Sequence, residues 1–352
     1  MEFTITMRLS SRKLLGLMKR SLTPNNPYHA QWLLTRRCNY RCKGCTVWRE
    51  PQNQKELSTE EIKEGFGILE KLGVVEIVLS GGNPLIRDDI AEIIDYSSQR
   101  FITTIYDNGS MAVKKIDALR NADFVAISLD TLNEEKNDYI KGVPSAWKKS
   151  MESIEILQKE GINVGVSPTI SQLNLNEIID FTRYFTYNGI PVWYCLYWYD
   201  YPSENRLFQI GKRQDEFEIT DIETMAKICD ALIEMKKERK GIFITNKTLE
   251  ALKQFFLNGQ RIWECKALQS FLMVDHLGNV AGCHLREPVA SIFELPDVWH
   301  SPKFQNLRAE FSQCNQCAYL CYIFYSLHSN VLSNLEILQD QWKNAKSLVS
   351  KA

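Results

Sequence analysis

The sequence predicts an α/β fold: a partial (β/α)6 barrel of the TIM type, followed by a small cysteine-rich C-terminal domain built from a β-hairpin and a helix. From about residue 30 to residue 200, short apolar or β-branched runs alternate with segments of helical period, which is typical of βα units around a parallel sheet. Eight of the ten cysteines lie in two clusters, one after the first predicted strand and one beyond residue 260. Six units are too few to close an eight-stranded barrel, so an open barrel is expected.

The predicted strands cover residues 31–34, 75–79, 103–106, 124–128, 164–169 and 192–197. The helix between the first two strands has clear ends, because Ser58 and Glu61 form a capping box at its start and Gly73 stops it. In such folds the loops after the carboxyl ends of the strands hold the chemistry, since residues from several strands converge only there.

The chain is expected to divide into four parts. These are a basic amphipathic segment (1–27), the barrel (28–210), linker helices with a second cysteine-bearing domain (211–334), and a C-terminal helix (335–352). The main boundary is placed where the βα rhythm stops, in a polar stretch near 203–220 that precedes helical segments at about 221–240 and 247–258.

Composition limits the function classes. The 352 residues are 44% hydrophobic and 24% charged, as in an ordinary globular protein, and the net charge of -1 argues against a broad nucleic-acid surface. No apolar run approaches the roughly 18 residues of a spanning helix, and no export signal is recognisable. We therefore expect a cytoplasmic protein, in which clustered cysteines indicate metal or redox chemistry before disulfides.

The first cluster, Cys38, Cys42 and Cys45, has the spacing C-x3-C-x2-C and is surrounded by arginine and lysine. Three thiolates can hold three irons of a four-iron cluster and leave the fourth iron open, and basic neighbours lower the cost of gathering the thiolates. A structural zinc would need a fourth protein ligand, whereas the nearest histidine, His29, precedes the strand. Iron is therefore favoured over zinc here.

This trio, together with Ser80-Gly81-Gly82-Asn83-Pro84 after the second strand, resembles the radical S-adenosylmethionine (SAM) superfamily. The resemblance implies a 4Fe-4S cluster on Cys38, Cys42 and Cys45 whose open iron is chelated by SAM. It also implies reductive cleavage of SAM to methionine and a 5′-deoxyadenosyl radical, which makes the three cysteines the catalytic set.

By the same resemblance, SAM is positioned by residues after the second, third and fourth strands. These are Gly81, Gly82, Asn83, Asn108 and Ser128. The glycines let backbone carbonyls approach the SAM ammonium group, and Ser128 would help bind the SAM carboxylate. Asn83 departs from the glutamate that is usual in the family, and Asp107 precedes Asn108 where a hydroxyl residue is common, so an Asx-type turn is an alternative there.

The second cluster contains five cysteines. Cys265 and Cys283 flank a predicted β-hairpin of residues 271–274 and 279–281, and Cys314, Cys317 and Cys321 follow. The C-x12-G-x4-C element resembles the start of the SPASM or shorter twitch extension of radical SAM enzymes, which implies one auxiliary 4Fe-4S cluster. Cys265, Cys283 and two of the last three cysteines would hold it, with the fifth spare or alternative; a zinc ribbon is the competing interpretation.

Two further features leave alternatives open. Cys195 lies in an aromatic run at the sixth strand, which is either a packed strand or a substrate-facing wall with a thiol able to relay an electron or hydrogen atom. Residues 7–22 combine leucines at helical spacing with basic residues, so this segment either contacts a membrane surface peripherally or packs against the barrel.

The main hypothesis is a radical SAM enzyme that abstracts hydrogen from a substrate C–H bond and carries one auxiliary cluster. Peptide, small-metabolite, tetrapyrrole and lipid substrates stay open, and a low-potential donor such as flavodoxin or ferredoxin is the expected partner besides SAM. The alternatives are a zinc-stabilised scaffold or binding protein and an iron-sulfur electron carrier on the same fold.

Overall fold

A computed structural model describes residue 13 and residues 26–49, 55–198 and 215–329. Within these residues the strands are β1 (His29–Thr35), β2 (Glu76–Gly81), β3 (Ile102–Asp107), β4 (Phe124–Ile127), β5 (Val164–Val166), β6 (Thr169–Ile170), β7 (Cys195–Leu196), β8 (Phe271–Val274), β9 (Asn279–Ala281) and β10 (Ala290–Ser291). The α-helices are α2 (Thr59–Leu72), α3 (Ile90–Ser98), α4 (Ile116–Leu119), α5 (Glu134–Lys141), α6 (Ala146–Lys159), α7 (Ile178–Tyr187), α8 (Ile222–Glu238), α9 (Asn246–Asn258), α10 (Leu295–Val298), α11 (Pro302–Gln313) and α12 (Leu320–Leu327).

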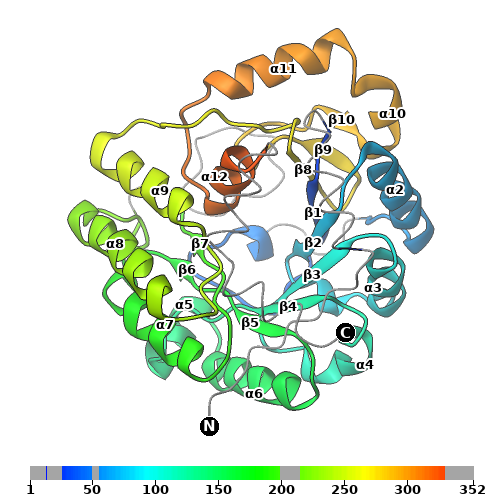
Figure 1. Cartoon of the computed structure of the whole chain (residues 1–352). Helices are drawn as coiled ribbons and strands as arrows, with labels where there is room; N and C mark the ends of the chain where they lie inside the picture. The colour runs from blue at the N-terminus through cyan, green and yellow to red at the C-terminus, as the bar shows by residue number, and fades with distance from the viewer. Residues whose placement is uncertain (1–12, 14–25, 50–54, 199–214, 330–352) are drawn as a thin grey trace.

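Strands β1 to β5 form a parallel sheet in sequential order, with helices outside it (Figure 1). The sheet continues beyond its first strand, because β8 pairs in parallel with β1 and the hairpin β8–β9 and strand β10 follow in the order β10-β9-β8-β1-β2-β3-β4-β5. The partial barrel is confirmed. The direct pairing of the cysteine-bearing hairpin with β1 was not expected from the sequence.

The fifth and sixth predicted strands are shorter than expected. The stretch 164–169 is divided into β5 and β6, because Pro168 lies between them and cannot donate to a strand ladder. In the stretch 192–197, only β7 is a named strand, and Val192 makes isolated bridges to Val166 and Ile242. The barrel therefore opens on this side.

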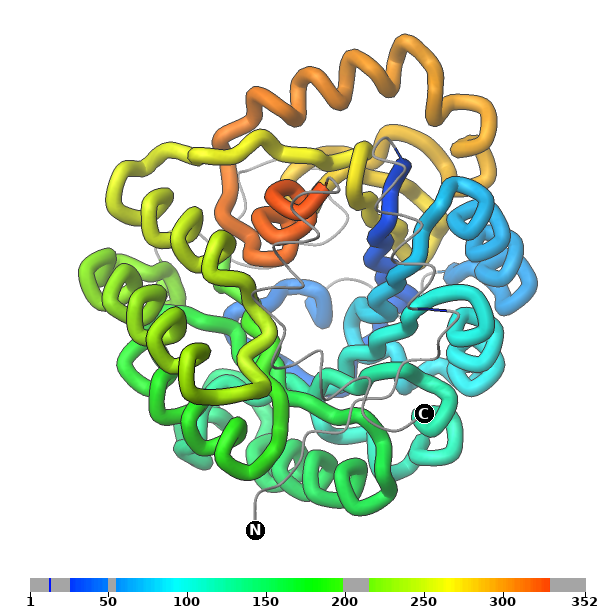
Figure 2. The backbone as a smooth tube through the Cα atoms, viewed as in Figure 1, coloured from blue at the N-terminus to red at the C-terminus, as the bar shows by residue number. Residues whose placement is uncertain are grey.

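Helix α12 lies inside the ring of strands, and the segment between α9 and β8 crosses the side where barrel strands are missing (Figure 2). The ring of Tyr325 in α12 stacks on the His29 ring with centroids 3.7 Å apart, and the Tyr325 hydroxyl donates to Glu76 Oε2 at 2.9 Å. His29 and Glu76 are the first residues of β1 and β2. Helix α12 therefore packs against the amino-terminal ends of β1 and β2 in the interior of the ring of strands, here called the lumen, opposite the loops that carry the predicted SAM site.

The packing between β1 and the helical layer, and the two ends of helix α2, follow from the residue types in the sequence. Trp32 of β1 points to the helical layer and packs edge-to-face on Phe66 at 5.0 Å, where Gly65 leaves room: a Cβ on Gly65 would lie 2.4 Å from the Trp32 ring. The predicted capping box of Ser58 and Glu61 is present at the start of α2, and Gly73 ends the helix in the left-handed conformation at φ 100°.

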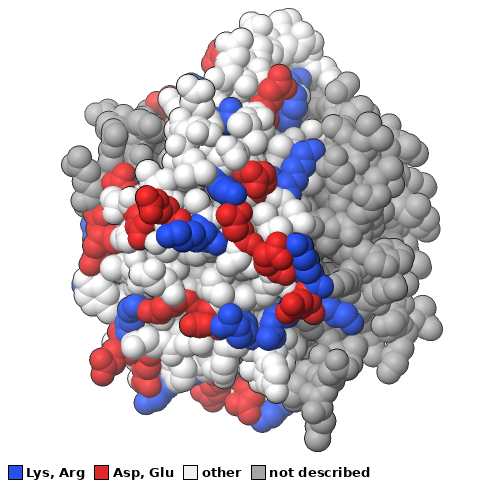
Figure 3. Space-filling view, turned by 60° about the vertical axis from the view of Figure 1, so that its left-hand side comes forward, with Lys and Arg blue, Asp and Glu red and all other residues white. Residues whose placement is uncertain are grey.

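On the face formed by α7, α8 and α9, acidic and basic side chains are interspersed (Figure 3). Lys253 pairs with Asp230 at 2.7 Å and Lys237 with Glu234 at 2.6 Å. Among the described helices, none combines the length and the apolar character needed to cross a bilayer. Segment 7–22 lies outside the described residues except for Lys13, whose ammonium donates to Asp123 at 2.6 Å, and the predicted C-terminal helix lies outside them as well.

Candidate functional site

The first cysteine trio lies in the loop after β1, and this loop is attached to the end of α5. Arg41 N donates to the Lys141 carbonyl at 3.3 Å and Lys43 N to the Ile140 carbonyl at 2.9 Å. Gly142 adopts φ 63°, and a Cβ on it would lie 2.1 Å from the Arg41 carbonyl oxygen. The close approach of two backbones at Gly142 therefore sets the position of the trio.

The three thiols are half-buried and have electrostatic contact with one another. Burial, the largest effect, raises the pKa of Cys42 to about 12 and of Cys45 to about 11, and burial also raises that of Cys38. Neutral thiols are the stable form without metal, and binding of iron would displace their protons. Because all ten cysteines carry free thiols, none is consumed by a disulfide.

The glycine pair after β2 is packed against the backbone that precedes the trio. Gly82 N donates to the Thr35 carbonyl at 2.7 Å and Asn83 N to the Arg37 carbonyl at 2.8 Å. A Cβ on Gly81 would lie 2.3 Å from the Thr35 oxygen, and one on Gly82 would lie 2.2 Å from the Arg37 oxygen. The glycines therefore allow two loops to meet, a role that the sequence analysis did not identify.

The side chain of Asn83 joins three loops. Its Oδ1 accepts from Leu85 N at 3.0 Å, while its Nδ2 donates to Asp107 Oδ1 at 2.8 Å and to Asn108 Oδ1 at 3.1 Å. Asn108 in turn donates to Asn39 at 2.9 Å, in the trio loop. The Asn83 side-chain oxygen thus caps a short helical turn, and a SAM contact for this residue stays a prediction.

Asp107 makes the Asx-type turn that the sequence left as an alternative. Its Oδ2 accepts from Gly109 N at 2.9 Å and from Ala112 N at 3.1 Å. Burial raises the pKa of Asp107, and the hydrogen bonds from Asn83 and the backbone oppose that rise. Asp107 is therefore a structural anchor for the loop after β3.

Ser128, after β4, is held by a buried ion pair. Lys141 Nζ donates to Ser128 Oγ at 2.7 Å and lies 2.7 Å from Asp130 Oδ2, and both charged side chains are 5% exposed. Burial acts to lower the pKa of Lys141, but Asp130 and then Cys42 outweigh burial and raise it. Lys141, which the sequence analysis missed, therefore brings positive charge to the trio and orients Ser128.

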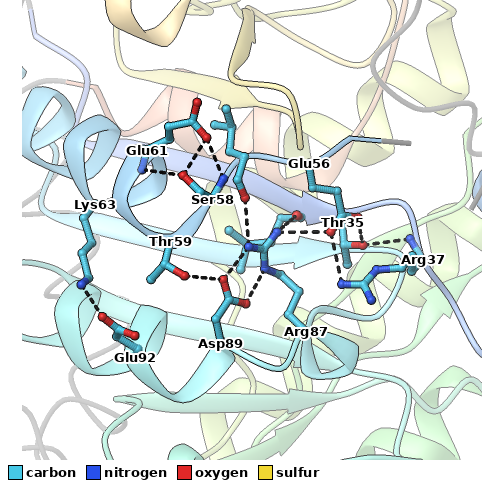
Figure 4. Close-up of polar contacts among 12 residues, drawn as sticks. Thr35, Arg37, Glu56, Ser58, Thr59, Glu61, Lys63, Arg87, Asp89 and Glu92 are labelled. Atoms are coloured by element: carbon cyan, nitrogen blue, oxygen red, sulfur yellow. Dashed lines mark hydrogen bonds and ion pairs between the residues drawn. The ribbon is translucent and has the colours of Figure 1, made fainter. Parts of the chain in front are cut away.

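A second network braces the loops after β1 and β2 (Figure 4). Arg87 is 5% exposed; its Nε donates to Asp89 at 2.9 Å and its Nη1 to the Leu34 carbonyl at 3.2 Å. Glu56 accepts from Arg87 at 3.3 Å and from Arg37 at 3.2 Å, and it also accepts from the Thr35 hydroxyl. No sequence spacing marks this network, since its members meet only in the fold.

Four of the five cysteines in the second cluster are mutual neighbours, and the fifth adjoins one of them. Cys265, Cys283, Cys314 and Cys317 are electrostatic neighbours of one another. Burial is the largest effect and raises the pKa of Cys317 to about 12 and that of Cys265 and Cys283 as well. Among the described residues, no three His, Cys, Asp or Glu side chains are close enough to hold a single metal ion. The four thiols share a neighbourhood in which an iron-sulfur cluster would be bound.

The fifth cysteine, Cys321, faces the lumen instead. The surrounding protein raises the pKa of the Cys321 thiol, and the neighbouring thiols of Cys195 and then Cys317 raise it further. Cys195 lies 3.5 Å from Ser167 Oγ and has a side-chain hydrogen bond with Tyr106. Cys195 thus has polar neighbours within its strand, and a contact with substrate stays a prediction.

Comparison with known proteins agrees with this geometry. A family model of the radical SAM superfamily matches residues 32–185, and a model of the SPASM iron-sulfur cluster-binding domain matches residues 265–322. The chain belongs to the radical SAM superfamily and carries a C-terminal SPASM domain. An AdoMet-dependent heme synthase of Methanosarcina barkeri is 26% identical over 318 residues, which are 84% of this chain and 89% of that protein.

Two further similarities concern parts of the chain or the fold alone. An Fe-coproporphyrin III synthase of Methanosarcina barkeri is 32% identical over 153 residues, which are 42% of this chain but only 38% of that protein. The crystal structure of SuiB from Streptococcus suis bound to S-adenosylmethionine has a TM-score of 0.64 at 16% identity, covering 92% of this chain and 77% of SuiB. The latter similarity shows the common fold.

As a radical SAM protein the chain is an enzyme that cleaves SAM at a 4Fe-4S cluster, and its SPASM domain implies auxiliary iron-sulfur binding. The residues present fit both groups: three free thiols gather after β1 next to the Lys141 ammonium, and four more gather around the hairpin β8–β9. The enzyme interpretation therefore replaces the scaffold and electron-carrier alternatives.

Proposed function

We propose that this enzyme oxidises its substrate by two electrons, with Cys265, Cys283, Cys314 and Cys317 holding the auxiliary cluster that accepts the second electron. When bound, the first cluster and SAM supply the 5′-deoxyadenosyl radical. The substrate C–H bond would break, and its hydrogen atom would leave in 5′-deoxyadenosine. Loss of a proton and of one electron from the substrate radical would then form a new C=C or C=X bond, and the auxiliary cluster would supply the electron acceptor.

The position of helix α12 is the observation that carries this proposal. Cys317 precedes α12 by three residues, and Cys321 in its first turn faces Cys195 and Tyr106 in the lumen. The auxiliary cysteines therefore adjoin the lumen in which a substrate would lie, while Ser128 and the trio loop stand at the carboxyl ends of the strands. A substrate between the two sites is near an electron acceptor.

Within the first site, each chain residue has a separate task in the proposal. Cys38, Cys42 and Cys45 would hold the SAM-cleaving cluster. Ser128, oriented by Lys141 at 2.7 Å, would bind the SAM carboxylate. The backbone after Gly82 and the amide network of Asn83 and Asn108 would shape the rest of the SAM pocket. A low-potential donor such as flavodoxin or ferredoxin would supply the electron that starts each turnover.

For the substrate we propose a tetrapyrrole. The heme synthase similarity extends over both the barrel and the SPASM region, whereas the Fe-coproporphyrin III synthase similarity covers only 42% of this chain. Similarity across the barrel and the SPASM region supports a substrate related to that of the heme synthase, because both regions border the lumen.

The test is anaerobic turnover of the reconstituted protein with SAM, a low-potential reductant and Fe-coproporphyrin III. We expect a product more oxidised by two electrons, with one methionine and one 5′-deoxyadenosine formed per product. Formation of 5′-deoxyadenosine without any change in the porphyrin would contradict the substrate class and leave SAM cleavage intact. A redox-neutral product would contradict the electron-accepting role of the auxiliary site.

A further inference from the structure

Arg261 lies against the loop that carries Cys314 and Cys317. Its Nη1 donates to the Cys314 carbonyl at 2.6 Å, and its Nε and Nη2 donate to the Cys317 carbonyl at 3.0 and 2.8 Å. The backbone amide of Arg261 donates to Asn315 Oδ1 at 2.9 Å. Because Arg261 is only four residues before Cys265, one residue joins the two segments that supply three of the four auxiliary cysteines.

The same guanidinium also donates directly to a ligand atom. Arg261 Nη2 lies 3.0 Å from Cys317 Sγ. A guanidinium is a rigid planar fork whose N–H groups keep a fixed geometry, so the carbonyl bonds that hold the fork also fix its direction toward the sulfur. The Trp263 ring, 5.3 Å from the guanidinium carbon, covers the cation.

The positive charge of Arg261 sets the direction in which it shifts the reduction potential of a nearby cluster. Reduction of an iron-sulfur cluster adds one negative charge to a group that is already anionic. A cation that donates to a ligand sulfur stabilises the reduced state more than the oxidised state, and hydrogen bonds to cluster sulfurs are a recognised control on the potential. Arg261 is partly buried, which reduces screening by salt, so part of the effect persists at ordinary ionic strength.

We propose that Arg261 is a positioning residue that clamps the Cys314–Cys317 loop and raises the reduction potential of the auxiliary cluster. The inference rests on the proposed function in that it takes Cys317 as a cluster ligand. A raised potential favours electron flow from a substrate radical to the cluster, which is the direction that two-electron oxidation requires. No sequence spacing marks Arg261, although basic residues also lie beside the first cysteine trio.

The experiment measures the auxiliary cluster alone. The full chain with Cys38, Cys42 and Cys45 changed to alanine is reconstituted anaerobically and titrated with reductant while its EPR signal is followed, without SAM or substrate. In this background we expect Arg261→Gln to lower the equilibrium constant for one-electron reduction at least about tenfold, a shift of about 59 mV to more negative potential. Arg261→Lys keeps the charge but loses the fork, so its shift should be smaller and in the same direction.

Arg308 provides a matched control. Its guanidinium is also partly buried and donates to the Leu268 carbonyl at 2.7 Å and the Trp299 carbonyl at 2.6 Å, and among the described residues it donates to no cysteine. Arg308→Gln removes a clamp of similar kind and should leave the potential of the cluster unchanged. A shift of equal size in Arg308→Gln would mean that loss of packing moves the potential, which overturns the proposal.

The outcomes separate this inference from the proposed function. If the Arg261→Gln protein binds about four irons and the reduction potential of its auxiliary cluster is unchanged, the inference is wrong and the assignment of the auxiliary cluster is unaffected. If Arg261→Gln loads no iron but Arg308→Gln does, the clamp is supported, and the potential of Arg261→Lys then decides the electrostatic part. Absence of iron from the parent variant contradicts the auxiliary cluster itself, and the inference fails with it.

Discussion

Three cations, of which Arg87 and Lys141 are buried and Arg261 is partly buried, shape the two sites at the scale of single residues. Arg87 braces the loops after β1 and β2, Lys141 holds Ser128 beside the trio, and Arg261 holds the loop of the auxiliary cysteines. The cysteines are recognisable in the sequence because their spacing is informative by itself. These cations are not, because a lone lysine or arginine has no spacing signal and its partners come from distant strands and helices.

The network around Arg87 gives a stability prediction. Arg87→Met leaves the Glu56 and Asp89 carboxylates without their shared partner, and removal of one member of a buried ion pair typically costs about 3–5 kcal/mol. We expect the denaturant midpoint of the metal-free protein to fall accordingly. Arg183 is the control, because its pair with Asp180 is exposed and Arg183→Met should change stability little. Equal effects of the two substitutions would contradict the bracing role.

The division of the second cysteine cluster gives a prediction about iron. Cys321 has Cys195 and then Cys317 as neighbouring thiols, whereas Cys317 is also an electrostatic neighbour of Cys265 and Cys283. Cys321→Ser should keep the auxiliary cluster, and Cys317→Ser should lose it, about four irons per chain. Iron and sulfide analysis after anaerobic reconstitution decides this, and loss of iron from Cys321→Ser would make Cys321 a ligand.

At the scale of elements, the sequence predicted the strands that form regular parallel pairs, and it was less informative where the barrel opens. The bounds of β8 and β9 agree with the predicted hairpin, because alternation and a glycine turn mark them locally. The break at Pro168 could have been read from the sequence, since proline interrupts a ladder. The pairing of β8 with β1 could not, because it joins residues about 240 positions apart.

Contact between the trio loop and α5 gives a prediction at this scale. In Gly142→Ala a new Cβ would clash with the Arg41 carbonyl, so the loop must move and the first cluster should be lost, with iron falling from about eight to about four. Gly161 is a matched control, because it has a similar positive φ of 71° and nothing within 4 Å of a new Cβ. Gly161→Ala should cost only backbone strain of about 1 kcal/mol and keep all iron. Iron analysis of the two variants checks this, and full iron loading of Gly142→Ala would contradict the account.

The attachment of α12 to β1 and β2 should depend on pH. Burial acts to raise the pKa of Glu76, but the hydrogen bonds from His29 and Tyr325 outweigh burial and lower it. A carboxyl group whose pKa is lower in the folded than in the unfolded protein stabilises the folded state fully at pH values above its unfolded pKa, about 4.3. This stabilisation is lost as the pH falls through the pKa of the folded protein. The stability advantage of the wild type over Glu76→Gln should therefore shrink below about pH 4.3. Denaturation of the metal-free proteins across pH measures it, and a constant difference would refute the assignment.

For the whole molecule, one continuous sheet joins the two cysteine sites. Strand β1 leads into the trio loop, and its parallel neighbour β8 belongs to the hairpin between Cys265 and Cys283. The sequence predicted two cysteine-bearing units and the superfamily, and the comparisons confirm the superfamily. It could not predict that the second unit extends the barrel sheet and sends α12 into the lumen, because both depend on long-range packing. This arrangement is the basis for placing a substrate between the two sites.

The most direct test of the account compares three anaerobically reconstituted proteins: the wild type, Cys38/Cys42/Cys45→Ala and Cys265/Cys283→Ala. Iron, sulfide and reductant-dependent 5′-deoxyadenosine formation from SAM are measured for each. We expect about eight irons in the wild type and about four in each variant, with SAM cleavage lost only when the first trio is removed. Zinc in place of iron, or SAM cleavage that survives loss of the first trio, would contradict the central claim that two iron-sulfur sites divide radical generation and electron acceptance.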